Sequence, residues 1–179
     1  TSYYAASVAR YWVEELVGIP CQVEIASEFR YRKVVVLPDT LFVTISQSGE
    51  TADTLAALRI AKAVGFFATM TICNVPTSSL ARESDLALML EAGTEVGVAS
   101  TKAFTAQLTN LLLLTIMLGR RHGLGAALEA EFVTALHGLD SAIEETLRLD
   151  IELHRLAERF VDCASRSIVG ITNALRGSI

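Results

Sequence analysis

A short apolar run that passes through a polar turn into a helical pattern is the feature that most constrains the fold of this chain. Residues 41–45 have the sequence Leu-Phe-Val-Thr-Ile, residues 46–51 have the sequence Ser-Gln-Ser-Gly-Glu-Thr, and a helical pattern covers residues 52–64. A buried strand that leads directly into a helix is typical of a parallel sheet, whose strands are joined by crossover helices. The sequence therefore predicts the α/β class.

The first 121 residues repeat this alternation. Strand-like runs cover residues 21–26, 40–45, 67–75 and 85–90, and helical patterns cover residues 2–17, 52–64, 80–83 and 101–121. Apolar residues make up 51% of the chain, which fits buried strands and helices. We expect a parallel sheet covered on both faces. Two amphipathic helical patterns follow at residues 126–149 and 151–164, and residues 167–171 are a candidate for a further strand.

Charge and hydropathy exclude some classes of partner. The formal net charge is −5, which argues against a nucleic-acid-binding surface. There is no signal-peptide pattern. The most apolar segment, residues 103–119, contains Gln107 and Asn110 and is shorter than a membrane span, so it predicts an interior helix. We expect a cytoplasmic protein that binds neither nucleic acid nor membrane.

Cysteines and histidines give no sign of a metal centre. Cys21, Cys73 and Cys163 are widely spaced, and no metal-ligand spacing connects them to one another or to the three histidines, His122, His137 and His154. Buried, reduced cysteines are the simpler interpretation, with catalysis as the alternative. The spacing of the histidines likewise supports no nucleophile–base pair.

The 46–51 turn has the composition of an anion site. Ser46, Gln47, Ser48 and Thr51 can each donate hydrogen bonds, and Gly49 lets the backbone approach a ligand closely. A turn that opens a helix also presents free backbone N–H groups and the positive end of the helix dipole. A phosphate would fit there, whereas the alternative interpretation is a serine-rich helix cap that binds nothing.

Two other helix starts carry small polar residues. Thr1 and Ser2 open the first helix, and residues 93–101 precede the long helix. Ligands gather where the strands of an open parallel sheet end, so convergence of these starts would make a hydroxyl-lined pocket for a phosphorylated sugar. Glu50 should then point away from the phosphate or pair with a base. Lys102 lies where the helix dipole disfavours a cation, which predicts either a role near an anion or an ordinary surface ion pair.

These motifs resemble those of the sugar isomerase (SIS) domain family. The phosphate-loop match is residues 46–54, and further matching runs are residues 23–32, 72–75, 82–85 and 92–105. Within the family, the runs resemble the isomerase half of glutamine–fructose-6-phosphate aminotransferases over about residues 1–165. The resemblance implies a flavodoxin-like three-layer α/β/α sandwich, which occurs twice per isomerase unit. It assigns residues 1–122 to a first SIS domain, 123–165 to a helical connector and 166–179 to a truncated second SIS domain or a divergent tail.

The resemblance also implies a function. Such enzymes make glucosamine 6-phosphate from fructose 6-phosphate and ammonia released from glutamine by a separate glutaminase domain, without a metal or an organic cofactor. The implied phosphate ligands are Ser46, Gln47, Ser48 and Thr51. Ser2 and the backbone of Val98 are implied to contact the sugar, and Ser100 and Lys102 lie in a matching motif of the sugar site. A homodimer is the implied assembly, with the glutaminase domain and a second SIS domain in the full-length protein.

Three departures from the family pattern limit the expected activity. The family has an apolar strand before the position of Thr1, so we expect a sheet that lacks its first strand and is weakened by that lack. Residues 170–179 do not continue the pattern. The family's acid–base glutamate, ring-opening histidine and Schiff-base lysine have no counterpart here, so we expect weak hexose 6-phosphate binding at most, without isomerisation. The alternatives are a non-catalytic SIS module that senses a phosphosugar in a regulator, and an inert α/β scaffold.

Overall fold

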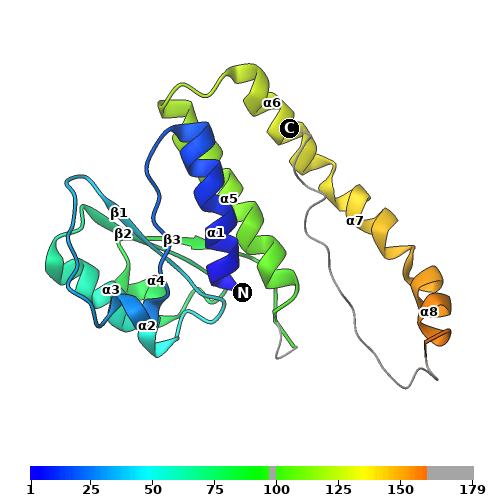
Figure 1. The fold of residues 1–179 in the computed structure, drawn as a ribbon, viewed down its shortest axis with the longest axis horizontal. Coiled ribbons are helices and arrows are strands. Elements are labelled where there is room, and N and C mark those ends of the chain that lie inside the picture. Colours follow the sequence, from blue (N-terminus) through cyan, green and yellow to red (C-terminus); the bar gives the residue numbers. More distant parts are fainter. Residues whose placement is uncertain (97–99, 161–179) are drawn as a thin grey trace. The chain divides into compact units, whose positions relative to one another are not determined.

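A parallel sheet of three strands organises the computed structural model, which describes residues 1–96 and 100–160. The strands are β1 (Leu41–Ile45), β2 (Ala68–Cys73) and β3 (Leu86–Met89), in the order β1-β2-β3 (Figure 1). The register pairs Val43 with Met70, and Met70 with Leu86. All three strands run in one direction, so their carboxyl ends share one edge of the sheet. The predicted parallel sheet is confirmed, with strand boundaries within two residues of those expected.

Helices cover both faces of this sheet (Figure 1). The helix α3 (Ala52–Val64) connects β1 to β2, and α4 (Ser79–Glu83) connects β2 to β3. With the short α2 (Ala26–Phe29), they occupy one face. The other face is covered by α1 (Ser2–Trp12), which continues into a π-helical turn, η1 (Val13–Val17), and by the long α5 (Lys102–Arg121). The three-layer α/β/α arrangement expected from the sequence is therefore present.

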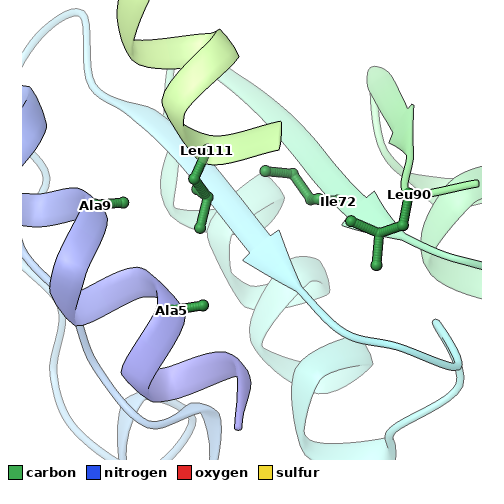
Figure 2. Packing of buried hydrophobic residues seen from close by; sticks show 5 residues of the cluster. All are labelled: Ala5, Ala9, Ile72, Leu90 and Leu111. Carbon is green, nitrogen blue, oxygen red and sulfur yellow. The ribbon is translucent and has the colours of Figure 1, made fainter. Parts of the chain in front are cut away.

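The core between the sheet and the α1–α5 layer is built from small and large apolar side chains. Ala5 and Ala9 of α1 and Leu111 of α5 pack with Ile72 and Leu90 (Figure 2). The two alanines have almost no exposed surface, which lets α1 lie close to its neighbours. The helix α5 is long and apolar enough to span a membrane by length and composition. It packs on α1 and buries one face, whereas Leu113 and Met117 on the other face are 43% and 63% exposed, so the predicted interior helix is only partly buried in the described part of the chain.

Threonines and aromatic rings fill the opposite face. Thr44 and Thr71 are buried on neighbouring strands, and their hydroxyls are 2.9 Å apart in a hydrogen bond. Phe29, Phe42 and Phe66 stack nearby, with the Phe42 ring centroid 5.0 Å from each of the other two. Strand residues alternate between the two faces, so the polar threonines and the apolar Val43 and Ile45 come from the same short runs.

The strand predicted at residues 21–26 is wrong. Ile25 has extended backbone angles, but residues 21–25 form no strand ladder with another described segment. The Cys21 N–H instead lies 3.4 Å from the Glu14 carboxylate, and Arg32 forms an ion pair with Glu24. The side-chain pattern of a strand is local, whereas a strand also needs a neighbour for its backbone groups.

A second compact unit begins at Ala130. It contains most of α6 (Ala126–His137), together with α7 (Leu139–Leu147) and α8 (Asp150–Glu158). The single helix predicted over residues 126–149 is interrupted at Gly138, where a glycine weakens helix continuation. These helices have no buried residues. The end of the predicted helix at 161–164 and the predicted strand at 167–171 lie outside the described residues.

Candidate functional site

The 46–51 turn follows β1 at the carboxyl edge of the sheet and is fixed to the end of β2. The Ser46 N–H donates to the carbonyl of Ile72, and the Asn74 N–H donates to the carbonyl of Gln47, both at 3.0 Å. The hydroxyl of Ser46 is buried and accepts a hydrogen bond from the Gly49 N–H at 3.1 Å. The turn is therefore preformed by backbone hydrogen bonds and by its own first serine.

Gly49 is required at its position for two physical reasons. Its φ of +68° lies in the left-handed region, which a residue with a Cβ adopts at a cost. A Cβ at Gly49 would also lie 2.5 Å from the Cβ of Ser78 and still closer to its hydroxyl. Because Ser78 caps α4 and is buried, it cannot move aside easily. The turn and the start of α4 are thus packed against each other without space for a side chain.

Glu50 points toward α4, and the hydrogen-bond partner of its carboxylate is a backbone N–H group and not a basic side chain. Its carboxylate accepts a hydrogen bond from the Ser79 backbone N–H at 2.7 Å. That hydrogen bond is the largest of the effects that hold the pKa of Glu50 below its ordinary value. Of the two expected alternatives, pairing with a base is not what the structure shows: Glu50 is exposed and directed to α4, where a free N–H group at the start of the helix satisfies the carboxylate.

The remaining polar groups of the turn make few hydrogen bonds to the rest of the described chain. The Ser48 hydroxyl accepts from the Glu50 N–H at 3.2 Å, and the hydroxyls of Ser46 and Thr51 are 3.3 Å apart. Within residues 1–96 and 100–160, the backbone N–H groups of Gln47, Ser48 and Ala52 donate to no acceptor. Ala52 is the first residue of the 13-residue α3, so the positive end of its dipole lies at the same place.

A pocket of about 510 Å³ lies beside this turn. It is bounded by Gln47 of the turn, by residues after β2 and by residues after β3; the lining residues are Gln47, Asn74, Val75, Pro76, Glu91, Gly93, Thr94 and Glu95. Residues of the 46–51 turn and of the loop before α5 therefore line the same pocket, whereas Thr1 and Ser2, the third helix start considered, are not among its lining residues. Ser46, Ser48 and Thr51 are not among the lining residues, so the pocket adjoins the hydroxyls of the turn and does not enclose them.

Asn74 holds the loop that forms the far wall of this pocket. Its side-chain amide donates to the carbonyl of Gly93 at 2.7 Å and accepts from the Ala92 N–H at 2.9 Å. The backbone N–H of the same residue holds Gln47 in the 46–51 turn. One residue thus connects the two walls of the pocket. Asn74 lies within the run at residues 72–75 that resembles the family, but no role for it could be predicted from the sequence.

Glu95 caps the long helix α5. Its carboxylate accepts from the Thr101 hydroxyl at 2.8 Å and from the Ala103 N–H at 3.1 Å. The Thr101 hydrogen bond is the main reason that the pKa of Glu95 lies below its ordinary value. Lys102, which begins α5, makes no ion pair within the part of the chain that the structure describes, and its Nζ lies close to Gly93. The alternative of a surface ion pair for Lys102 is thus not what the structure shows.

Ser2 meets α5 about one and a half turns further along that helix, at Gln107. The Gln107 side-chain amide donates to the Ser2 hydroxyl at 3.0 Å. The start of α1 is thereby joined to α5, and the loop before α5 is joined to the 46–51 turn. The Ser100 hydroxyl is buried and has no partner among the described residues. Val98 lies outside the described residues.

Asn74, Glu95 and Gln107 are three site residues that sequence reasoning missed. Gln107 carried a detectable signal, because it stands between Ala103 and Leu111 at the four-residue spacing of a buried helical face. For Asn74 and Glu95, only their position in the sequence was informative. Asn74 directly follows β2, and Glu95 precedes α5 by several residues. Their partners could not be inferred from the sequence pattern.

The cysteines have structural surroundings. Cys73 is fully buried, with its sulfur 3.5 Å from the Ser78 hydroxyl. Cys21 is only partly buried, contrary to the expected burial, and this partial burial, together with Glu14, raises its thiol pKa. A raised pKa disfavours the thiolate, so Cys21 lacks the character of a nucleophile. Cys163 lies outside the described residues.

Together, the parallel sheet and the polar turn at its carboxyl edge define a class of protein. The SIS-domain family profile matches residues 1–117, and the chain belongs to this family. Its fold is similar to the C-terminal domain of glucosamine-fructose-6-phosphate aminotransferase from Francisella tularensis, with a TM-score of 0.85 and 48% sequence identity. That similarity covers 90% of this chain and 45% of the Francisella chain.

Curated relatives point to the same kind of enzyme. The chain is 63% identical over 163 residues to the glutamine–fructose-6-phosphate aminotransferase (isomerizing) of Pseudomonas putida, and 60% identical over 163 residues to that of Vibrio cholerae. Each match covers 90% of this chain and 27% of the relative. The chain therefore spans about a quarter of the length of these relatives.

Proposed function

We propose that this chain is a hexose-6-phosphate-binding SIS domain from the isomerase half of a glutamine–fructose-6-phosphate aminotransferase. The observation that carries the proposal is the preformed 46–51 turn, whose unused N–H groups lie beside its hydroxyls at the start of α3. The relatives named above supply the enzyme: their names state the substrate and the isomerising reaction. Since those relatives are matched along most of the chain, the regulator alternative is not favoured.

In this proposal, the 46–51 turn binds the phosphate. Ser46, Gln47, Ser48 and Thr51 donate hydrogen bonds through side chains, supplemented by backbone N–H groups and the helix dipole. The Ser79 N–H holds the Glu50 carboxylate at α4, so the negative charge of Glu50 faces this N–H group and not the phosphate. Ser2, Val98, Ser100 and Lys102 are assigned to the sugar, and the Nζ of Lys102 lies close to Gly93 in the loop before α5.

The chemistry of the whole enzyme needs further residues. Transfer of a proton between two carbons of a sugar requires a positioned base, and no residue of this chain is assigned that role. We infer that the chain binds hexose 6-phosphate without converting it. A glutaminase domain and a second SIS domain complete the enzyme in the full-length protein, which we place in the cytoplasm.

Titration of the chain with fructose 6-phosphate tests the proposal. We expect amide chemical-shift changes in residues 46–52, weaker shifts with inorganic phosphate and none with fructose. Ser48→Ala and Thr51→Ala should each weaken binding about three- to tenfold, because each loses one hydrogen bond to a charged group. No shifts at the turn would favour the inert scaffold instead, and glucosamine 6-phosphate formed on addition of ammonia would contradict the lack of catalysis.

We further propose a homodimer. Apolar and aromatic side chains are exposed on α1, and the most exposed are Tyr4 and Tyr11, at 67% and 68%. Exposed apolar surface of this kind is typical of protein interfaces. Sedimentation equilibrium checks this proposal, and a monomer at all concentrations would exclude it.

A further inference from the structure

Gln107 is the most deeply buried polar side chain near the proposed sugar site. It has no exposed surface and stands on the face of α5 that packs against α1. Its Nε2 donates to the Ser2 hydroxyl, while its Oε1 is buried without a partner among the described residues. An apolar side chain would fill the same position without an unsatisfied polar atom. Packing alone therefore does not account for a glutamine here.

The hydrogen bond from Gln107 determines what the Ser2 hydroxyl can do. A hydroxyl that accepts from an amide still has its own proton to donate. Within the described part of the chain, Ser2 Oγ makes no second side-chain hydrogen bond. Its proton is therefore available to an acceptor at the start of α1, where the helix dipole also favours an oxygen with negative charge density.

We propose that Gln107 is a positioning residue that fixes the Ser2 hydroxyl as a hydrogen-bond donor to an oxygen of the sugar. This inference rests on the proposed function, because it assigns the orientation of one group in the same site. It separates the roles of the two regions: the 46–51 turn holds the phosphate, and the Ser2–Gln107 pair reads the sugar part of the ligand. Binding of inorganic phosphate should then be independent of Gln107.

A double-mutant cycle on the 179-residue chain tests this separation. Gln107→Met removes the amide at similar volume, and Ser2→Ala removes the hydroxyl. We expect each variant to bind fructose 6-phosphate about three- to tenfold more weakly, the range for one lost hydrogen bond. The double variant should be no weaker than Ser2→Ala alone. The affinity for inorganic phosphate should stay unchanged in all three.

Thr115→Val is the matched control. Thr115 is equally buried on α5, and its hydroxyl donates to the carbonyl of Leu111 in the same helix. This variant should lower the thermal midpoint of unfolding without changing either affinity. If Gln107→Met weakened binding only through general destabilisation, Thr115→Val variants of similar stability would show the same loss of affinity, and the proposal would be overturned.

Two further measurements keep the inference testable if Gln107→Met does not fold. In the wild-type chain, fructose 6-phosphate should shift the side-chain amide resonances of Gln107, and inorganic phosphate should not; equal shifts with both ligands, or with neither, overturn the proposal. At a pH above the pKa of the introduced carboxyl, Gln107→Glu places a group there that only accepts. Retained affinity at that pH would show that Ser2 donates toward residue 107 and would overturn the proposal.

The outcomes separate this inference from the proposed function. A wild-type chain that binds neither fructose 6-phosphate nor inorganic phosphate contradicts both. Wild-type binding of both ligands, combined with full additivity of Ser2→Ala and Gln107→Met, contradicts the positioning role alone.

Discussion

At the scale of single residues, Gly49 and Gly18 form a natural comparison. Both have left-handed backbone angles, with φ of +68° and +72°, but a Cβ at Gly18 would meet nothing within 4 Å. Gly18→Ala should cost about 1–2 kcal/mol through backbone strain alone. Gly49→Ala adds the collision with Ser78 and should cost about 2–5 kcal/mol in the free energy of unfolding. Urea unfolding of both variants measures the difference, and equal losses would contradict the close packing of the turn.

Asp85 gives the chain a pH dependence that the structure explains. The hydroxyl of Thr69 donates to its carboxylate at 2.7 Å, the Thr69 backbone N–H donates at 2.8 Å, and Lys62 lies 3.1 Å away. These contacts lower the pKa of Asp85 from 3.8 to about 2. Because the folded-state pKa is depressed, the stabilisation is complete above pH of about 4 and is lost as the pH falls through about 2.

Asp85→Asn tests this assignment. The variant should be less stable than the wild type at neutral pH, and the difference between them should shrink as the pH falls from about 4 to about 2. Chemical denaturation at a series of pH values measures it. A difference that stays constant down to pH 2 would show that the charge of Asp85 is unimportant.

Residue-level features that depend on local chemistry were accessible from the sequence. The 46–51 turn was recognised because its serines, its glycine and the following helix are contiguous. Gln107 and its partner Ser2 are separated by 105 positions, so no local pattern connects them. The hydrogen-bond donors of the 46–51 turn could be predicted from the sequence. The side chains that hold the neighbouring segments in place could not.

At the scale of elements, the loop before α5 depends on two side chains. Asn74 fixes its first half, and Glu95 caps the helix that follows. Loss of a helix cap costs about 0.5–2 kcal/mol. Glu95→Gln should therefore fray the first turn of α5 and speed hydrogen exchange at the Ala103 amide by about two- to thirtyfold, which NMR can measure.

Glu91→Gln is the control for the capping prediction. Glu91 lines the same pocket and carries the same charge, but its carboxylate accepts no hydrogen bond from the described residues. Its replacement should leave exchange at Ala103 unchanged. Faster exchange in both variants would mean that the charge of the pocket, and not the cap, holds the start of α5.

The elements themselves were predicted with uneven success for a physical reason. The helices at residues 52–64 and 102–121 and all three strands of the sheet were found, because hydrophobic periodicity and breaking residues are local signals. The strand at residues 21–26 was wrong because strand formation depends on a partner. The helix break at Gly138 was missed because one glycine inside a helical pattern is often tolerated.

At the scale of the first compact unit, stability depends on the layer formed by α1 and α5. Leu111 is 6% exposed and packs with Ala5, Ala9, Ile72 and Leu90 (Figure 2). Leu111→Ala should leave a cavity and lower the free energy of unfolding by about 2–5 kcal/mol. Leu113, two residues away on the same helix, is 43% exposed, and Leu113→Ala should cost less than about 1 kcal/mol. Similar losses in the two variants, measured by denaturant unfolding, would contradict the packing described here.

The contact between the 46–51 turn and α4 has a practical consequence. The Gly49 carbonyl accepts from the Leu80 N–H at 3.1 Å, and the Glu50 carboxylate accepts from the Ser79 N–H. Any opening of the turn must release these two amides to solvent. Deuterium uptake at the Ser79 and Leu80 amides therefore reports how often the turn opens. The measurement is made on a segment outside the turn itself.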